Sequence, residues 1–383
     1  MKITVFANYA NPSKVPLYKT LYERSGHQLI LAASEPMEAK FLEQGYPDLN
    51  QLEFVERIYE CEDLLARAKQ LASESDVLIY GHCPVEYFNL AVRSGKPVFR
   101  LSQHIYRDGN LKAVPLKWKV SYFVKHTLAL WRKPVYLMCM GVYTAQDFSL
   151  TGSYRNKMFE FGEFTEIVEY DLEELMAFKH DSPVQITWIN EFKDWYHPET
   201  AVQLAKQLEG LPCRIDLYGN GELQNSFQST SEELHIHEMP TLKELKSILN
   251  HTDIFLMTGD CNEGWGSMLN QAMNHGCACV VSTRIGASKM IEQNINGLLY
   301  EYGNMDDLSR KVKKLMEDHE LRDKLGRNAY HSMLKEWNGV NAGNRFYELM
   351  VALLEGKGSP FSSGLCAPAP ILTKEDINRR AKG

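Results

Sequence analysis

Short apolar segments of strand length alternate with amphipathic helices along most of this chain of 383 residues. One helix is indicated where Ala201, Leu204, Ala205 and Leu208 recur at helical spacing. This alternation favours an α/β fold with parallel sheets built from strand-helix-strand units. The expected strands lie at residues 3–6, 29–32, 77–80, 98–101 and 135–138 in the first half and at 185–188, 214–218, 234–237, 254–257 and 278–282 in the second.

The chain is too long for one ordinary hydrophobic core and fits two domains of about 150 to 200 residues. We expect the boundary between the two domains in the polar and acidic stretch 163–182, which precedes Pro183. Glycine, serine and proline gather after residue 355 and predict a flexible end. The expected parts are an N-terminal Rossmann-like domain over 1–170, a C-terminal one over 171–340, a helix over 341–355 and a tail over 356–383.

The overall charge of -7 gives no general attraction to nucleic acid, so no nucleic-acid partner is expected. Residues 3–6 enter a strand at once, without the pattern of a signal peptide, and no run of about 18 apolar residues follows. These features predict a cytoplasmic protein. The eight cysteines include no Cys-x-x-Cys pair, which favours a reduced chain with no metal or other cofactor.

The turn Glu263-Gly-Trp-Gly266 is the segment that points most directly to a ligand. It follows the expected strand 254–257 and precedes a helix, and open α/β sheets bind their ligands at such carboxyl ends of strands. Gly264 and Gly266 lack a Cβ atom, so backbone donors can approach a ligand closely. The plainer interpretation of Glu263 is a solvated loop carboxylate or a charge at the N-terminus of the helix.

A series of segments occurs in a characteristic order along the chain. The segments are 81–86, 143–147, 156–162, 188–198, 217–222, 253–257, 263–266, 272–276, 296–300 and 327–337. This series resembles the retaining GT-B glycosyltransferases of the group-1 or GT4-type family, as found in bacterial surface polysaccharide biosynthesis. The resemblance implies two facing Rossmann-like domains and a C-terminal helix that packs back toward the N-terminal domain.

By this resemblance the protein is a metal-independent, hexosyltransferase-type enzyme. It would move a sugar, with retention, from a nucleotide diphosphate sugar to a glycan or lipid-linked sugar acceptor. By the resemblance, Glu263 would contact the hydroxyls of the donor sugar, and Gln271 would contact the nucleotide ribose. The remaining donor contacts fall on the turn Gly264, Trp265, Gly266 and Ser267.

Several residues depart from the family's pattern. Glu191 and Tyr196 stand where the family provides an arginine and a lysine for the diphosphate, and Gln271 replaces an acidic residue. A carboxylate repels a diphosphate, and each lost charge-assisted contact costs about 1.5 to 3 kcal/mol. Candidate replacements are Lys193, Arg284 and Lys289, which are equally compatible with ordinary surface charge.

On the acceptor side, Ser102-Gln103-His104 stands where related enzymes carry Ser-Glu-Arg. His104 is a candidate base or hydroxyl donor, although a lone histidine is more often structural. The departures support a competing function, in which a catalytically impaired protein of this fold binds glycan or supports a partner transferase.

Residues 112–133 form a basic and amphipathic segment. From Gly109 to Gln146 there is no acidic residue, whereas lysine, arginine and tryptophan recur. Such a segment can lie on an anionic membrane, which would place the protein peripherally at the inner face of the membrane. The alternative is a helix whose apolar stripe, including Phe123 and Trp131, packs into the N-terminal core.

Overall fold

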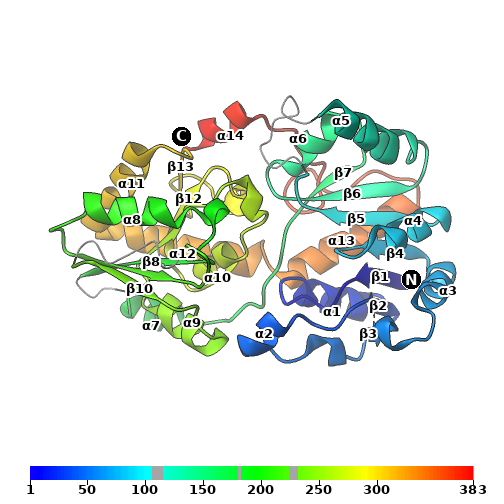
Figure 1. The fold of residues 1–383 in the computed structure, drawn as a ribbon, viewed down its shortest axis with the longest axis horizontal. Coiled ribbons are helices and arrows are strands. Elements are labelled where there is room, and N and C mark those ends of the chain that lie inside the picture. The colour runs from blue at the N-terminus through cyan, green and yellow to red at the C-terminus, as the bar shows by residue number, and fades with distance from the viewer. Residues whose placement is uncertain (106–114, 180–182, 224–231, 383) are drawn as a thin grey trace. The chain divides into compact units, whose positions relative to one another are not determined.

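The structure is a computed structural model that describes residues 1–105, 115–179, 183–223 and 232–382. The chain divides into two compact units (Figure 1). Unit 1 comprises residues 1–166 and 338–371, and unit 2 comprises residues 167–337 and 372–383. Each unit contains one parallel sheet with helices in the connections, as the alternation of strands and helices predicts.

Unit 1 is built on a seven-stranded parallel sheet in the order β3-β2-β1-β4-β5-β6-β7. Apolar side chains of its strands and helices, such as Phe6, Leu78 and Leu137, form a buried core. The strands are β1 Ile3–Ala7, β2 Leu29–Ala33, β3 Val55–Arg57, β4 Val77–Tyr80, β5 Val98–Ser102, β6 Val135–Met140 and β7 Met158–Phe161. The helices are α1 Val15–Arg24, α2 Ala39–Glu43, α3 Leu64–Glu74, α4 Val85–Arg93, α5 Leu116–Tyr122, α6 Thr144–Ser149 and α13 Gly339–Leu354.

Unit 2 is built on a six-stranded parallel sheet in the order β10-β9-β8-β11-β12-β13. Its core includes Trp188, Ile215 and Val280, all of them buried. The strands are β8 Val184–Ile189, β9 Cys213–Tyr218, β10 Leu234–His237, β11 Ile254–Met257, β12 Ala278–Ser282 and β13 Leu298–Tyr300. The helices are α7 Leu172–Ala177, α8 Pro198–Gln207, α9 Leu242–Asn250, α10 Met268–Asn274, α11 Met305–Glu317, α12 His319–Lys335 and α14 Lys374–Arg380.

All ten strands expected from the sequence are present, within two residues at each end. The described residues contain three further strands, β3, β7 and β13, which were not expected. Each lies at an edge of its sheet, and β3 and β13 are only three residues long. Segments this short contain too few residues to show a period of apolar side chains.

Helix α13 belongs to unit 1, which confirms the expected C-terminal helix that packs back on the N-terminal domain. It lies beside α1 (Figure 1), and two glycines permit the close approach. A Cβ atom at Gly339 would lie 2.5 Å from Pro16, and one at Gly343 would lie 2.6 Å from Thr20. Phe346 of the same helix is buried, with its ring 5.2 Å from that of Phe99.

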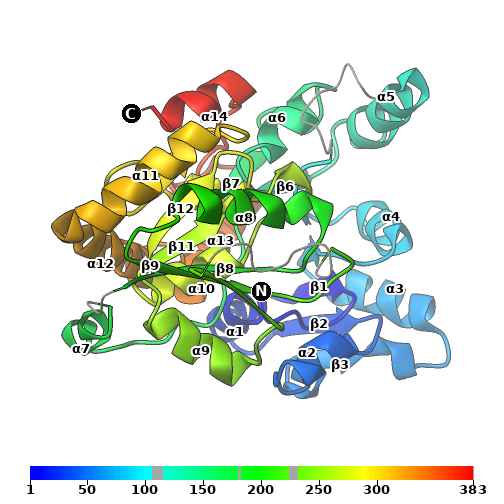
Figure 2. The same ribbon diagram turned by 60° about the vertical axis from the view of Figure 1, so that its left-hand side comes forward.

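Residues 356–382 are placed against the units, whereas their composition predicts a flexible tail. In unit 1 this segment adds to the edge strand β7, where Glu160 N donates to Ala367 O at 2.8 Å and Cys366 N donates to Glu160 O at 2.8 Å. The chain then enters unit 2 as α14, which lies next to α11 (Figure 2). Edge strands have unpaired backbone groups, and pairing them orders a segment of low apolar content.

Within the described ranges, the helices lack the combination of length and apolar character that a membrane crossing requires.

Candidate functional site

Two loops meet at the carboxyl edge of the sheet in unit 2. One follows β8 and the other follows β11, and these strands are neighbours in the sheet. Thr258 Oγ1 donates to Tyr196 O at 2.7 Å, and Asp260 N donates to Trp195 O at 2.9 Å. The buried indole of Trp188 donates to Thr258 Oγ1 at 2.8 Å from inside the core. These hydrogen bonds fix the two loops to each other and hold Glu263 in place.

The carboxyl group of Glu263 is enclosed, although part of the residue remains exposed. A Cβ atom at Gly259 would lie 1.9 Å from Glu263 Oε2, so only glycine leaves room for this carboxyl group. Asn190 Nδ2 donates to Oε1 at 3.2 Å, while Oε2 is buried without a hydrogen-bond partner in the described part of the chain. A buried, unpartnered carboxyl oxygen is costly unless it is protonated or a ligand contacts it.

Burial raises the pKa of Glu263 to about 8, and the hydrogen bond from Asn190 opposes this shift only in part. At neutral pH the group is therefore mostly a neutral carboxylic acid. Such a group has one donor and remaining acceptor capacity, which suits a pair of sugar hydroxyls. The plainer interpretation, a solvated loop carboxylate, does not agree with this burial.

The glycine turn after Glu263 is clamped from its other side. Gly286 N donates to Gly264 O at 2.9 Å, and Ala287 N donates to Trp265 O at 2.8 Å. Gly264 and Gly266 have φ values of 78° and 85°, a region that favours glycine. The side chain of Trp265 is buried, and its Nε1 donates to Asn270 Oδ1 at 2.8 Å. The side chain of Trp265 is thus not available to a ligand.

A second group at this edge is centred on His197, which has a φ of 52° directly before Pro198 starts α8. Its Nδ1 lies 2.6 Å from Glu199 Oε1, and its Nε2 lies 3.4 Å from Asp260 Oδ2 and 2.8 Å from the hydroxyl of Tyr302. Hydrogen bonds to Asp260 and Glu199 raise the pKa of His197 to about 9. The imidazole is therefore charged at neutral pH.

Sequence reasoning missed Asn190, His197, Asp260 and Tyr302 as parts of this edge. The available signal was position, because Asn190 and Asp260 come within three residues of the ends of β8 and β11. The carboxyl ends of neighbouring parallel strands meet at one edge of a sheet.

The residues expected to contact a diphosphate have mixed surroundings. Lys193 forms an ion pair with Glu191, so the first candidate cation faces the carboxylate that departs from the family's pattern. Burial raises the pKa of Tyr196 to about 12, so this side chain is a neutral phenol. The Arg284 guanidinium lies 5.8 Å from the centre of the Tyr302 ring, next to the His197 group.

The other expected donor residues are spread over the following helix and loop. Lys289 lies 5.8 Å from the centre of the Trp337 ring. Ser267 precedes α10, and Gln271 lies within that helix with part of its surface exposed. The structure therefore brings Glu263, Gly264 and Gly266 together, and Arg284 joins them through the segment 284–287. It does not bring Lys289 or Gln271 into hydrogen-bond contact with Glu263.

In unit 1, the segment Ser102, Gln103 and His104 lies at the carboxyl end of β5. His104 Nδ1 is 3.6 Å from Asp147 Oδ2, and the same oxygen accepts a hydrogen bond from Ile105 N at 2.8 Å. The Asp147 side chain is almost fully buried on α6. Gln103 Nε2 donates to Glu163 Oε1 at 3.3 Å. The Asp147 carboxylate thus lies next to the His104 ring, at a distance slightly longer than a hydrogen bond.

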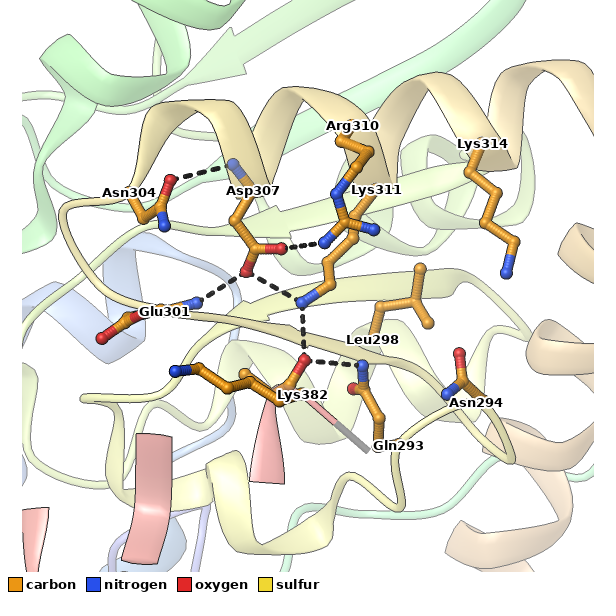
Figure 3. A pocket seen from close by; sticks show the side chains of 11 residues that line it. Gln293, Asn294, Leu298, Glu301, Asn304, Asp307, Arg310, Lys311, Lys314 and Lys382 are labelled. Carbon is orange, nitrogen blue, oxygen red and sulfur yellow. Dashed lines mark hydrogen bonds and ion pairs between the residues drawn. The ribbon is translucent and has the colours of Figure 1, made fainter. Parts of the chain in front are cut away.

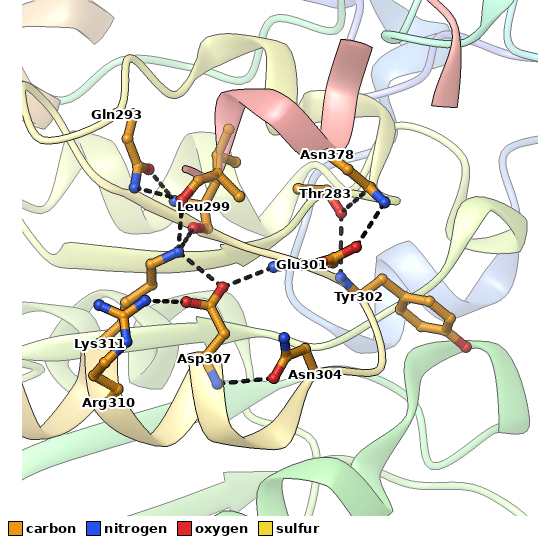
Figure 4. A network of polar contacts seen from close by, with 11 residues as sticks. Thr283, Gln293, Leu299, Glu301, Tyr302, Asn304, Asp307, Arg310, Lys311 and Asn378 are labelled. Atoms are coloured by element: carbon orange, nitrogen blue, oxygen red, sulfur yellow. Dashed lines mark hydrogen bonds and ion pairs between the residues drawn. The ribbon is translucent and has the colours of Figure 1, made fainter. Parts of the chain in front are cut away.

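A separate pocket of about 440 Å³ lies between α11 and the end of α14 (Figure 3). Arg310, Lys314 and Lys382 line it, but its buried cation, Lys311, is already engaged. Lys311 Nζ donates to Asp307 Oδ2 at 2.8 Å and to Ala381 O at 2.9 Å. Figure 4 shows this network continuing through Glu301 and Asn378 to Thr283. Its role is to attach α14 to the sheet.

The eight cysteines are thiols and not disulfides, and Cys277 and Cys279 are buried in the core. Within the residues that the structure describes, no three or more His, Cys, Asp or Glu side chains gather as a metal site would require.

Residues 177–332 match the family model of the glycosyl transferases group 1. An uncharacterized glycosyltransferase of Methanocaldococcus jannaschii is 30% identical over 108 residues, or 28% of each chain. The N,N'-diacetylbacillosaminyl-diphospho-undecaprenol alpha-1,3-N-acetylgalactosaminyltransferase of Campylobacter jejuni is 31% identical over 100 residues, or 26% of each chain. The matched region thus spans about a quarter of the length of these two curated relatives.

Solved structures resemble this chain over nearly its whole length. HepE of Anabaena, in a complex with UDP and glucose, has a TM-score of 0.66 at 14% identity and covers 92% of this chain and 99% of its own. The lipopolysaccharide outer core galactosyltransferase WaaB has a TM-score of 0.66 at 14% identity, with 92% and 100% covered. These similarities, together with the two parallel sheets, confirm the expected GT-B fold.

Proposed function

We propose that the protein is a glycosyltransferase that binds a nucleotide diphosphate sugar on unit 2. The observation that carries this proposal is the enclosed carboxyl group of Glu263 at the carboxyl edge of the sheet. It lies between Gly259, Gly266 and Asn190, inside the region that matches group-1 glycosyltransferases. A neutral acid there can both donate to and accept from sugar hydroxyls.

The leaving diphosphate needs positive charge or backbone donors that are already in place. His197 and Arg284 supply charge at this edge, whereas the charge of Lys193 is offset by Glu191. We assign to His197 and Arg284 part of the diphosphate binding that the family assigns to an arginine and a lysine. In this proposal no metal takes part, and transfer proceeds with retention, as the resemblance implies.

The acceptor is assigned to unit 1, where His104 lies next to the Asp147 carboxylate and would take the proton of an acceptor hydroxyl. Two similar proteins guide the choice of substrates. HepE was solved with UDP and glucose, which favours a UDP-hexose as the first donor to test. The Campylobacter jejuni relative is named for a diphospho-undecaprenol sugar, which favours a lipid-linked acceptor in surface polysaccharide biosynthesis.

The second candidate function is a catalytically impaired protein that binds glycan or supports a partner transferase. The specific observation in its favour is the ion pair between Glu191 and Lys193, which leaves this loop without net positive charge.

Calorimetric titration with UDP, ADP and GDP separates the two functions. We expect the wild type to bind one of these nucleotides, and Glu191→Arg to bind it at least tenfold more tightly because a repulsion is replaced by a charge-assisted contact. Glu23→Arg, at an exposed position in unit 1, makes the same charge change as a control. Binding by Glu191→Arg but by neither the wild type nor the control would favour the impaired protein.

Turnover provides the second half of this test. The donor in this assay is the hexose conjugate of whichever nucleotide binds. Glu263→Ala is expected to lower transfer strongly while leaving the protein folded, because it removes both the donor and the acceptor proposed for the sugar hydroxyls. The anomeric configuration of the product, read by NMR, tests retention. Full activity in EDTA is expected, and activity that requires an added divalent cation would contradict the proposed metal-independent reaction.

A further inference from the structure

The segment formed by α5 and the following helical turn Phe123–Leu128 exposes its large apolar side chains. Leu116 is 75% exposed and Trp131 is 66% exposed, whereas apolar residues of a surface helix normally face the core. The structure therefore contradicts the alternative in which this stripe, including Phe123, packs into unit 1. We call this surface the apolar face, which consists of Leu116, Trp118, Val120, Phe123, Val124, Leu128 and Trp131.

Polar side chains hold much of this segment against unit 1. His126 Nδ1 lies 2.9 Å from Arg100 Nη1, and Thr127 Oγ1 donates to Thr151 O at 2.8 Å. Burial, with Arg100 nearby, lowers the pKa of His126 to about 3, so the imidazole is neutral in this contact. Leu130 is buried, while its neighbours in sequence Ala129 and Trp131 are exposed. The segment thus has its polar contacts inside and its apolar side chains outside.

Basic residues surround the apolar face and acidic ones are absent from the same stretch. Residues 115–133 contain five basic side chains and no aspartate or glutamate, in a chain whose net charge is -7. The basic residues are Lys117, Lys119, Lys125, Arg132 and Lys133. The expected segment 112–133 begins three residues earlier, and Lys112 lies outside the described residues.

The apolar face continues onto the neighbouring helix. An open hollow of about 380 Å³ is lined by Lys119, Val120, Phe123, Leu150 and Thr151. Leu150, directly after α6, is itself exposed. The hollow is therefore lined mainly by apolar side chains and has a lysine at its border.

We propose that the apolar face docks on an anionic lipid bilayer, lying in the plane of the interface. Exposed apolar side chains beside basic ones match the headgroup and acyl boundary of such a membrane. Trp118 and Trp131 are of the residue type that concentrates at this boundary. Each lysine or arginine near an anionic surface increases binding by about fivefold. Docking uses only unit 1 and does not depend on the proposed transfer reaction.

Co-sedimentation of the full chain with vesicles tests this docking. We use phosphatidylcholine vesicles with and without about one third phosphatidylglycerol. The wild type is expected to partition strongly onto the anionic vesicles, and the combined change of Lys117, Lys119 and Lys125 to Gln is expected to lower that partition on the order of 100-fold. Trp118→Ser with Trp131→Ser is expected to lower it at least tenfold.

A matched control neutralises three exposed lysines elsewhere, Lys69, Lys206 and Lys243, on α3, α8 and α9. This control makes the same change in net charge and is expected to retain binding. Circular dichroism shows whether each variant is folded, and nucleotide affinity is expected to be unchanged in all of them. Equal binding to neutral and anionic vesicles, equal loss in the control, or no vesicle binding by the wild type would overturn the proposal. If the wild type were a dimer that did not bind vesicles, and the tryptophan variant were a monomer, the apolar face would instead bind a second copy of this chain.

Discussion

Glu263 keeps its carboxyl group beneath Gly259 and beside Asn190, and burial there raises its pKa to about 8. In the unfolded chain the same group ionises near pH 4.5. Between these two values the folded protein holds a proton that the unfolded chain has lost, so stability falls as pH rises. This contribution is fully present below about pH 4.5 and is lost as pH rises through about 8.

Glu263→Gln is expected to remove this part of the pH dependence. Between pH 5.5 and 7.5 the wild type should lose about 2 kcal/mol more unfolding free energy than the variant, measured by urea unfolding at both values. Glu209→Gln changes an exposed carboxyl of the same unit and should leave the pH dependence as it is in the wild type. If the unfolding free energy changed equally with pH in the wild type and in Glu263→Gln, Glu263 would ionise as an ordinary carboxyl group.

At the scale of residues, the position of Glu263 could be predicted because a glycine turn follows a strand. Its burial could not, because Asn190 is 73 residues away and reaches it only through the pairing of β8 with β11. His197 was hidden for the same reason, since its partners Asp260 and Tyr302 belong to other loops.

At the scale of elements, α14 fastens the loop that carries Arg284 and Lys289. Arg380 Nη2 donates to Ile291 O at 2.9 Å, and Asn378 accepts from Thr283 and donates to Glu301. The sequence did not reveal this helix, because only Ile377 is a buried apolar residue within its seven positions. Its local signals were a capping box formed by Thr373 and Asp376, acidic residues in the first turn and basic residues in the last turn.

Arg380→Ala is expected to lower the unfolding free energy by about 1 to 3 kcal/mol, because buried carbonyl groups lose a charged donor. Arg379→Ala is the matched control on the same helix, where the side chain is exposed and lies 3.7 Å from Asp376. It should cost less than about 0.5 kcal/mol. Urea unfolding measures both, and equal losses would mean that helix propensity, and not the contact with Ile291, holds α14.

At the scale of the whole molecule, each unit has its own sheet and its own buried core. The proposed donor site uses only residues of unit 2, so a nucleotide should stabilise that unit selectively. Tryptophan fluorescence reports on the unfolding of unit 2, because this unit contains Trp188, Trp195, Trp265 and Trp337. The two remaining tryptophans, Trp118 and Trp131, are exposed in unit 1 and can be changed to Phe.

In that double variant, a nucleotide at 100 times its dissociation constant should stabilise unit 2 by about 2.7 kcal/mol. For a unit of this size the fluorescence midpoint should rise by roughly 5 to 10 °C. Circular dichroism should show a further transition, from unit 1, that the nucleotide does not shift. A single transition seen by both probes, with the same nucleotide shift, would contradict this independence. A shift confined to the circular dichroism signal would place the nucleotide on unit 1 and remove the role proposed for Glu263.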